Sequence, residues 1–125
     1  MSPRVLLVED NEVNRYLVRF VLEQAGFVVD VAVDGAQALE RARQALPDLI
    51  LMDLRMPVLD GYEATLRLKA DPALRAVPVA ALSAQAMPHE IARALEVGCV
   101  AHFDKPIDVR RFAEQVRALL ASHPR

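Results

Sequence analysis

The chain has 125 residues, of which 54% are apolar and 26% charged, and its formal net charge at pH 7 is −2. This length and composition predict one globular domain over 1–125 and exclude a disordered chain, and the small net charge gives no reason to expect a nucleic-acid partner. No apolar run approaches the roughly 20 residues of a membrane span, the first residues lack a signal-peptide core, and Cys99 has no second cysteine to pair with, so we expect a cytoplasmic protein without a membrane partner.

The first third of the chain predicts two strands with a helix between them. Residues 4–8 and 27–33 are apolar runs of the length that strands have. Asn11 opens the intervening helix, and Gly26 ends it. The apolar residues that share one face of this helix are Val13, Tyr16, Leu17, Phe20 and Val21.

The middle of the chain predicts a buried strand between two helices. A turn at 34–35 leads into a helix that Pro47 ends, with Ala38, Leu39, Ala42 and Leu46 on one face. The run LILMD at 49–53 has four apolar residues followed by Asp53, which is typical of a strand buried on both faces. A third helix is predicted over 61–69.

The last third of the chain repeats the alternation. Residues 77–82 predict a fourth strand, which is followed by a helix from about Pro88 to Val97 with Gly98 as its stop signal. The short apolar segment 99–103 predicts a fifth strand. A final helix that frays near Ser122 carries Val109, Phe112, Val116 and Leu119 on one face.

Strict alternation of strands and helices predicts an α/β fold of five βα units, in which a parallel sheet has helices on both faces. In open sheets of this kind, ligands bind beyond the carboxyl ends of the strands. Polar residues follow four of the five predicted strands there, and we expect them to lie together: Glu9, Asp10, Asp53, Ser83 and Lys105.

This set of residues suits phosphoryl transfer. Three neighbouring carboxylates favour recruitment of a cation, and oxygen ligands of this kind suit Mg²⁺. A carboxylate can also act as a nucleophile and form an acyl phosphate. We therefore interpret Asp53 as the acceptor, with Mg²⁺, the Ser83 hydroxyl and the Lys105 ammonium each holding an oxygen of the transferred group.

Four motifs resemble the receiver domains of response regulators in two-component signalling: VLLVEDNEVN, LILMDLRMPVLDG, ALSAQAM and HFDKPID, in this order and over essentially the whole chain. The resemblance, which extends to chemotaxis receivers, single-domain regulators and hybrid kinases, implies a doubly wound, flavodoxin-like sheet of order 2-1-3-4-5. It implies that Asp53 is the phosphoacceptor and that Asp10 binds Mg²⁺ directly. Glu9 would bind the ion through water, and the backbone carbonyl of Arg55 would be the third protein ligand.

The same resemblance assigns roles to the later loops. Ser83 would be the switch hydroxyl, and Lys105 would stabilise the phosphoryl group and be joined to Pro106 by a cis peptide bond. Arg55 and Gln85 would tune the lifetime of the phosphoryl group. His102 departs from the pattern, because the family has Tyr or Phe three residues before the lysine. It is either a switch residue with pH sensitivity or a surface histidine without such a role.

The function implied is that of a phosphorylation-dependent signalling module, not an enzyme, that takes its phosphoryl group from a histidine kinase or a histidine phosphotransfer protein. No output domain follows the last helix, so we expect the signal to pass to a downstream protein. In the family, kinases dock near positions that here are Asn14, Arg15 and Pro106. The output face would include Glu90, Arg93, His102, Asp108, Arg110 and Arg111.

Two other functions compete with this one. A Mg²⁺-dependent phosphohydrolase with an aspartyl-phosphate intermediate would need a second acid two residues after the nucleophile, where this chain has Arg55, and a cap insertion, which it lacks. A scaffold of the pseudo-receiver kind would lack one of the acids or the lysine, and here Glu9, Asp10, Asp53 and Lys105 are all present.

Overall fold

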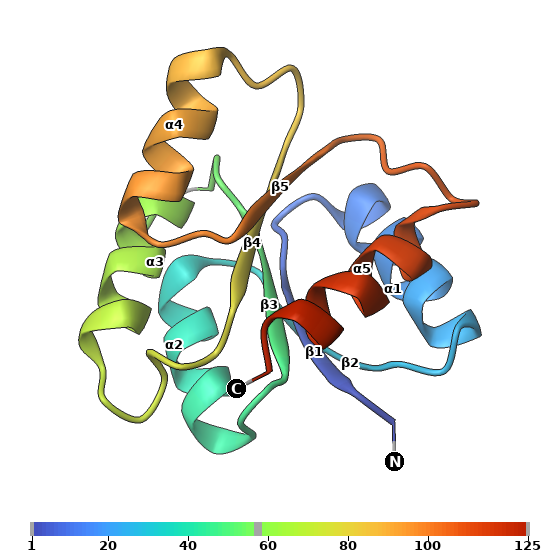
Figure 1. Cartoon of the computed structure of the whole chain (residues 1–125), viewed down its shortest axis with the longest axis horizontal. Helices are drawn as coiled ribbons and strands as arrows, with labels where there is room; N and C mark the ends of the chain where they lie inside the picture. Colours follow the sequence, from blue (N-terminus) through green and yellow to red (C-terminus); the bar gives the residue numbers. More distant parts are fainter. Residues whose placement is uncertain (1, 57–58, 125) are drawn as a thin grey trace.

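The computed structural model describes residues 2–56 and 59–124, which form alternating strands and helices (Figure 1). In chain order the elements are β1 (Arg4–Val8), α1 (Glu12–Gln24), β2 (Val28–Ala32), α2 (Gly35–Gln44), β3 (Leu49–Asp53), α3 (Gly61–Ala70), β4 (Val79–Ser83), α4 (Pro88–Val97), β5 (Ala101–Asp104) and α5 (Phe112–Ser122).

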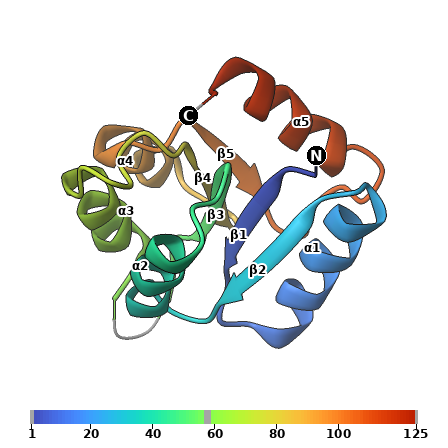
Figure 2. The same ribbon diagram turned by 90° about the horizontal axis from the view of Figure 1, so that it is seen from below.

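The five strands form one parallel sheet in the order β2-β1-β3-β4-β5, which confirms the predicted doubly wound α/β fold. Helices α2, α3 and α4 cover one face of the sheet, and α1 and α5 cover the other (Figures 1 and 2). Since all strands run the same way, their carboxyl ends meet at one edge. Within the described residues, no helix is both long and apolar enough to cross a membrane.

β3 is the central strand, and it is buried along its whole length as predicted. Its side chains alternate between two hydrophobic cores: Ile50 and Met52 pack beneath α2, α3 and α4, whereas Leu49 and Leu51 pack beneath α1 and α5. A strand held from both sides in this way fixes the position of the Asp53 backbone at its end.

The buried face of α1 agrees only in part with the predicted one. Leu17 and Val21 of the predicted face are partly buried against the core, but Val13, Tyr16 and Phe20 are exposed, and the buried residues of the helix are Val18 and Leu22. The helix carries more apolar residues than the sheet and α5 can cover, so periodicity alone did not identify the stripe that packs. The exposed stripe includes a stacked pair of rings, Tyr16 and Phe20, with centroids 6.1 Å apart.

Several element ends also differ from the predicted ones. β4 and β5 begin two residues later than expected and each extends one residue further, so that Ser83 lies within β4. α2 ends at Gln44, three residues before Pro47. The predicted face of the last helix included Val109, but this residue is exposed and lies before α5. It lies outside the helix because the backbone around Asp108 forms a turn before α5 begins.

Candidate functional site

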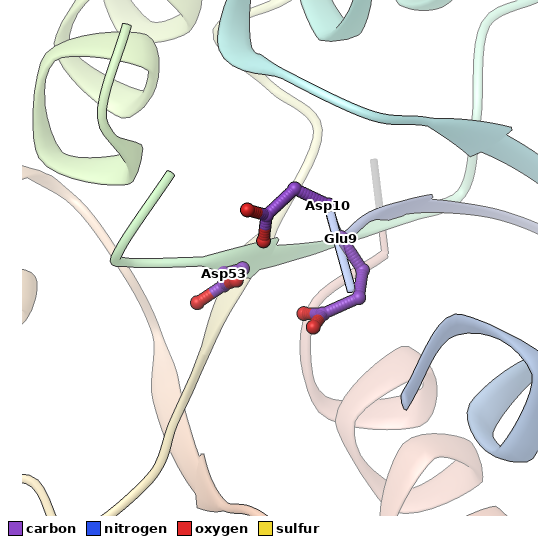
Figure 3. Close-up of side chains that lie close together, drawn as sticks. All are labelled: Glu9, Asp10 and Asp53. Atoms are coloured by element: carbon purple, nitrogen blue, oxygen red, sulfur yellow. The ribbon is translucent and has the colours of Figure 1, made fainter. Parts of the chain in front are cut away.

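Three carboxylates converge at the carboxyl edge of the sheet, as predicted (Figure 3). Glu9 and Asp10 follow β1, and Asp53 ends β3, the strand that pairs with β1. One carboxylate oxygen from each of the three lies within 4.8 Å of the others. Glu9 and Asp53 are buried, whereas Asp10 is exposed, so the cluster opens to solvent on the Asp10 side.

Lys105 joins this cluster from the loop after β5. Its Nζ lies 3.1 Å from both carboxylate oxygens of Glu9 and 3.4 Å from Oδ2 of Asp53. Asn14 on α1 donates a further hydrogen bond to Glu9, over 3.4 Å. The ammonium therefore compensates two buried carboxylates at once, which removes part of the cost of burying them.

Gly61 allows α3 to approach the backbone behind Asp53. A Cβ atom on this residue would lie 2.3 Å from the Asp53 carbonyl oxygen and 2.8 Å from Cα of Leu54, and neither backbone atom can move aside. The Gly61 amide donates to the Leu54 carbonyl over 3.2 Å, and Asp60 caps the helix by accepting from the Glu63 amide. The close packing of α3 at Gly61 thus also fixes the acceptor strand.

Burial and, as the next largest cause, the negative charge of Glu9 raise the pKa of Asp53 from 3.8 to about 7. Two contacts act in the opposite direction: the Arg55 amide donates to Oδ1 of Asp53 over 3.1 Å, and the Lys105 ammonium attracts the carboxylate. Asp53 is consequently a carboxyl group that changes its protonation state near neutral pH.

Ser83 and His102 form a hydrogen-bonded pair on neighbouring strands. Ser83 is buried at the end of β4, and its Oγ lies 2.8 Å from Nε2 of His102 on β5. The His102 side chain is only 10% exposed, with the Asp104 carboxylate 3.9 Å from the same ring nitrogen. The ring is thus largely enclosed by its neighbours. Whether the pair acts as a switch stays a prediction.

The remaining predicted residues surround the cluster. The Lys105–Pro106 peptide bond is cis, as expected. Gln85 is exposed and has a positive φ of 50°, whereas the Arg55 side chain is directed toward α4, where its Nη2 lies 2.7 and 3.0 Å from the two carboxylate oxygens of Glu90. The part that Arg55 and Gln85 play in phosphoryl lifetime, and the Arg55 carbonyl as a metal ligand, stay predictions.

The donor set of this site fits a hard divalent cation. All three side chains offer oxygen, the exposed Asp10 leaves room for water, and Mg²⁺ characteristically keeps several waters beside one or two carboxylates. Lys105 already neutralises part of the charge of Glu9 and Asp53. A cation would therefore complete the charge balance of the cluster.

Sequence reasoning missed three features of the site. It did not find the inward direction of His102, the ion pair between Arg55 and Glu90, or the close approach that requires glycine at position 61. The ion pair joins residues 35 positions apart and has no local signature.

Comparisons with known proteins agree with this geometry. The family model of the response regulator receiver domain matches residues 5–117. The polar-differentiation response regulator DivK of Brucella ovis is 42% identical over 120 residues, which cover 96% of this chain and 98% of that protein.

Solved structures show the same similarity. The receiver domain of the sensor histidine kinase PA1611 from Pseudomonas aeruginosa, with a magnesium ion coordinated in its active site cleft, is 35% identical with a TM-score of 0.85, and the match covers 98% of each chain. The chemotaxis protein CheY4 of Vibrio cholerae is 27% identical with a TM-score of 0.89, over 94% of this chain and 98% of that one. The chain thus belongs to the response regulator receiver domains, the phosphorylation-dependent switches of two-component signalling.

Proposed function

We propose that Asp53 accepts a phosphoryl group in the presence of Mg²⁺ and that the domain over 1–125 passes this signal to another protein. The observation that carries the proposal is the contact of one ammonium, Lys105, with two of three clustered carboxylates at the end of the central strand. Such a set concentrates positive and negative charge where a phosphoryl group needs both a nucleophile and counter-charges.

In the transfer step, a carboxylate oxygen of Asp53 attacks the phosphorus of a phosphohistidine. An O–P bond forms while the N–P bond breaks, and its electron pair passes to the imidazole nitrogen of the donor. The buried strand keeps the nucleophile in place, and the Arg55 amide orients the carboxylate through Oδ1. Catalysis here consists mainly of positioning and charge stabilisation.

Glu9, Asp10, Asp53 and the Arg55 carbonyl would hold Mg²⁺, which supplies counter-charge for the oxygens of the transferred group. Lys105 would move its ammonium from Asp53 to a phosphoryl oxygen while keeping Glu9. Ser83 would donate its hydroxyl hydrogen to another phosphoryl oxygen. In the unphosphorylated protein this hydroxyl is hydrogen-bonded to His102, so its movement to the phosphoryl group would change the hydrogen bonding of His102. The Ser83–His102 pair would then have two arrangements, as a switch requires.

We further propose that the donor, a histidine kinase or a histidine phosphotransfer protein, docks on α1. The exposed stripe of Val13, Tyr16 and Phe20 lies on the helix whose first turns contact the site: Asn14 reaches the Glu9 side chain, and Arg15 donates to the Glu9 carbonyl over 3.1 Å. A partner seated on this stripe would bring its phosphohistidine to the open side of the cluster.

The downstream protein would bind the face formed by α4, β5 and the start of α5. This surface adjoins His102 and carries charges of both signs, from Glu90, Arg93, Asp108, Arg110 and Arg111. It changes when the pair of Ser83 and His102 changes, which is the requirement for an output surface. We infer that both partners are proteins of the cytoplasm, that no nucleic acid is bound, and that no substrate is turned over.

Neither competing function receives comparable support. A phosphohydrolase would place an acid where Arg55 lies, and the guanidinium there is already paired with Glu90. A scaffold that is never phosphorylated would not need Lys105 in contact with two buried carboxylates.

The test is phosphoryl uptake from phosphoramidate, a small donor with the N–P bond of phosphohistidine, followed by intact mass with and without Mg²⁺. We expect one phosphoryl group per chain, only with Mg²⁺ and not in Asp53→Asn. Asp34→Asn is the matched control, because Asp34 follows β2 at the same sheet edge and asparagine keeps its helix cap. Uptake by Asp53→Asn equal to that of the wild type would refute the proposal.

A further inference from the structure

An ion pair connects the loop after the acceptor strand with α4. Nη2 of Arg55 lies 2.7 and 3.0 Å from the two carboxylate oxygens of Glu90, which is in the first turn of α4. The Glu90 carboxylate is held by its own helix as well, because it accepts a hydrogen bond from the Met87 amide over 3.0 Å. The carboxylate is thus the fixed member of the pair, and the 64% exposed Arg55 side chain is the free one.

Arg55 is also connected with the acceptor. Its amide donates to Oδ1 of Asp53 over 3.1 Å, so its Cα is fixed beside the reacting carboxylate. Hydrogen bonding to Glu90 raises the pKa of Arg55 most, and the negative charge of Asp53 contributes a smaller effect in the same direction. The guanidinium therefore lies within the electrostatic range of both acids, and its hydrogen bonds run to Glu90.

Phosphorylation of Asp53 would change the balance between these two acids. A phosphoryl group carries close to two negative charges at neutral pH and offers oxygens that match the guanidinium fork as well as a carboxylate does. Glu90 offers one negative charge. The solvent-exposed side chain can rotate about its own bonds without disturbing packed residues, so the stronger anion can attract it away from α4.

We propose that Glu90 is a positioning residue for the phosphorylated state: it holds the Arg55 guanidinium on α4 in the unmodified protein and competes with the phosphoryl group for it afterwards. This inference rests on the proposed function, because it needs Asp53 to be phosphorylated. It connects the site with α4 independently of the Ser83–His102 pair on β4 and β5. It also makes α4 the element that loses a contact when the phosphoryl group arrives.

The proposal predicts opposite effects for the two members of the pair. The measured quantity is the rate of phosphoryl loss from Asp53, followed by intact mass in Mg²⁺ after removal of phosphoramidate. Arg55→Gln removes a counter-charge from the phosphoryl group, and we expect about two- to fivefold faster loss, the range that an exposed ion pair supplies. Glu90→Gln removes the competitor while keeping an acceptor for Met87, and we expect loss about two- to fivefold slower.

A double variant and a matched control complete the experiment. Arg55→Gln/Glu90→Gln should lose phosphate as fast as Arg55→Gln, because Glu90 acts only through Arg55. Arg43→Gln is the control, since Arg43 pairs with Asp71 over 3.0 Å with side-chain exposures of 58% and 19%, close to the 64% and 17% of the Arg55–Glu90 pair. We expect this variant to lose phosphate at the wild-type rate.

Three outcomes would overturn the inference. An unchanged or faster rate in Glu90→Gln would show that Glu90 does not compete for Arg55. If Glu90→Gln slowed phosphoryl loss equally in the presence and absence of Arg55, Glu90 would act through its own charge and not through Arg55. A change of the same size in Arg43→Gln would attribute the effects to general stability. Absence of phosphoryl uptake by the wild type refutes the proposed function itself, and so is distinct from these results.

Discussion

Replacement of Asp53 by asparagine should stabilise the metal-free protein at neutral and alkaline pH. The carboxyl group is buried at the end of β3 beside the Glu9 carboxylate, and these two causes raise its pKa to about 7. Asparagine has nearly the same shape and no charge. The substitution therefore removes an unfavourable buried charge without opening a cavity.

The sign follows from proton binding. The folded protein holds the Asp53 proton more tightly than the unfolded chain, so the stability that this group contributes is complete below about pH 4 and is lost as the pH rises through about 7. A pKa moved from 3.8 to about 7 corresponds to about 4 kcal/mol, at ~1.36 kcal/mol per pKa unit. Since asparagine also gives up the attraction of Lys105, we expect a net gain of about 1–3 kcal/mol above pH 7.

The assay is thermal and urea unfolding followed by circular dichroism from pH 4 to pH 8.5 in a chelating buffer. For a domain of this size, a gain of 1–3 kcal/mol raises Tm by about 4–12 °C. The gain should vanish near pH 4, and added Mg²⁺ should reduce it because the ion stabilises the wild type by mass action. An Asp53→Asn protein no more stable than the wild type at pH 8, or a gain independent of pH, would refute this reasoning.

Other consequences of the geometry can be measured directly. The Mg²⁺ affinity of the wild type should rise with pH up to about 7 and then level off, because the ion must displace the Asp53 proton; calorimetric titrations that give one affinity from pH 5.5 to 8 would contradict this. Gly61→Ala should lower the free energy of unfolding by about 1–3 kcal/mol and reduce phosphoryl uptake, because its Cβ collides with the backbone of Asp53 and Leu54; wild-type stability in urea would contradict the close approach. His102→Phe should cost about 1 kcal/mol, because the buried Ser83 hydroxyl loses its partner, and the cost should disappear in a Ser83→Ala background; an equal cost in both backgrounds would assign it to packing.

The sequence was most informative where the physics is local or periodic. Five apolar runs separated by amphipathic stretches leave few arrangements other than a parallel sheet, and the sheet in turn brings Glu9, Asp10 and Asp53 to one edge. Lys105 was predicted at the same edge because it follows β5, and its contact with two carboxylates there agrees with this prediction.

Features that depend on which distant parts of the folded chain come into contact were not predictable in this way. Which stripe of α1 packs depends on how much apolar surface the sheet and α5 can cover, and this left Tyr16 and Phe20 exposed although their spacing suits a buried face. The Arg55–Glu90 pair depends on the distance between a loop and the start of α4, which composition does not encode. Helix ends were uncertain for a similar reason, because Val109 is apolar but precedes the first turn of α5.

The residue that carries the phosphoryl group can be located chemically. The protein would be phosphorylated with phosphoramidate and Mg²⁺ and reduced with borohydride, which converts an aspartyl phosphate to homoserine, and the peptides would then be sequenced by tandem mass spectrometry. We expect homoserine at position 53 and at no other aspartate, only in samples that contained Mg²⁺. Homoserine at another aspartate, or a phosphoryl group that borohydride does not remove, would contradict it.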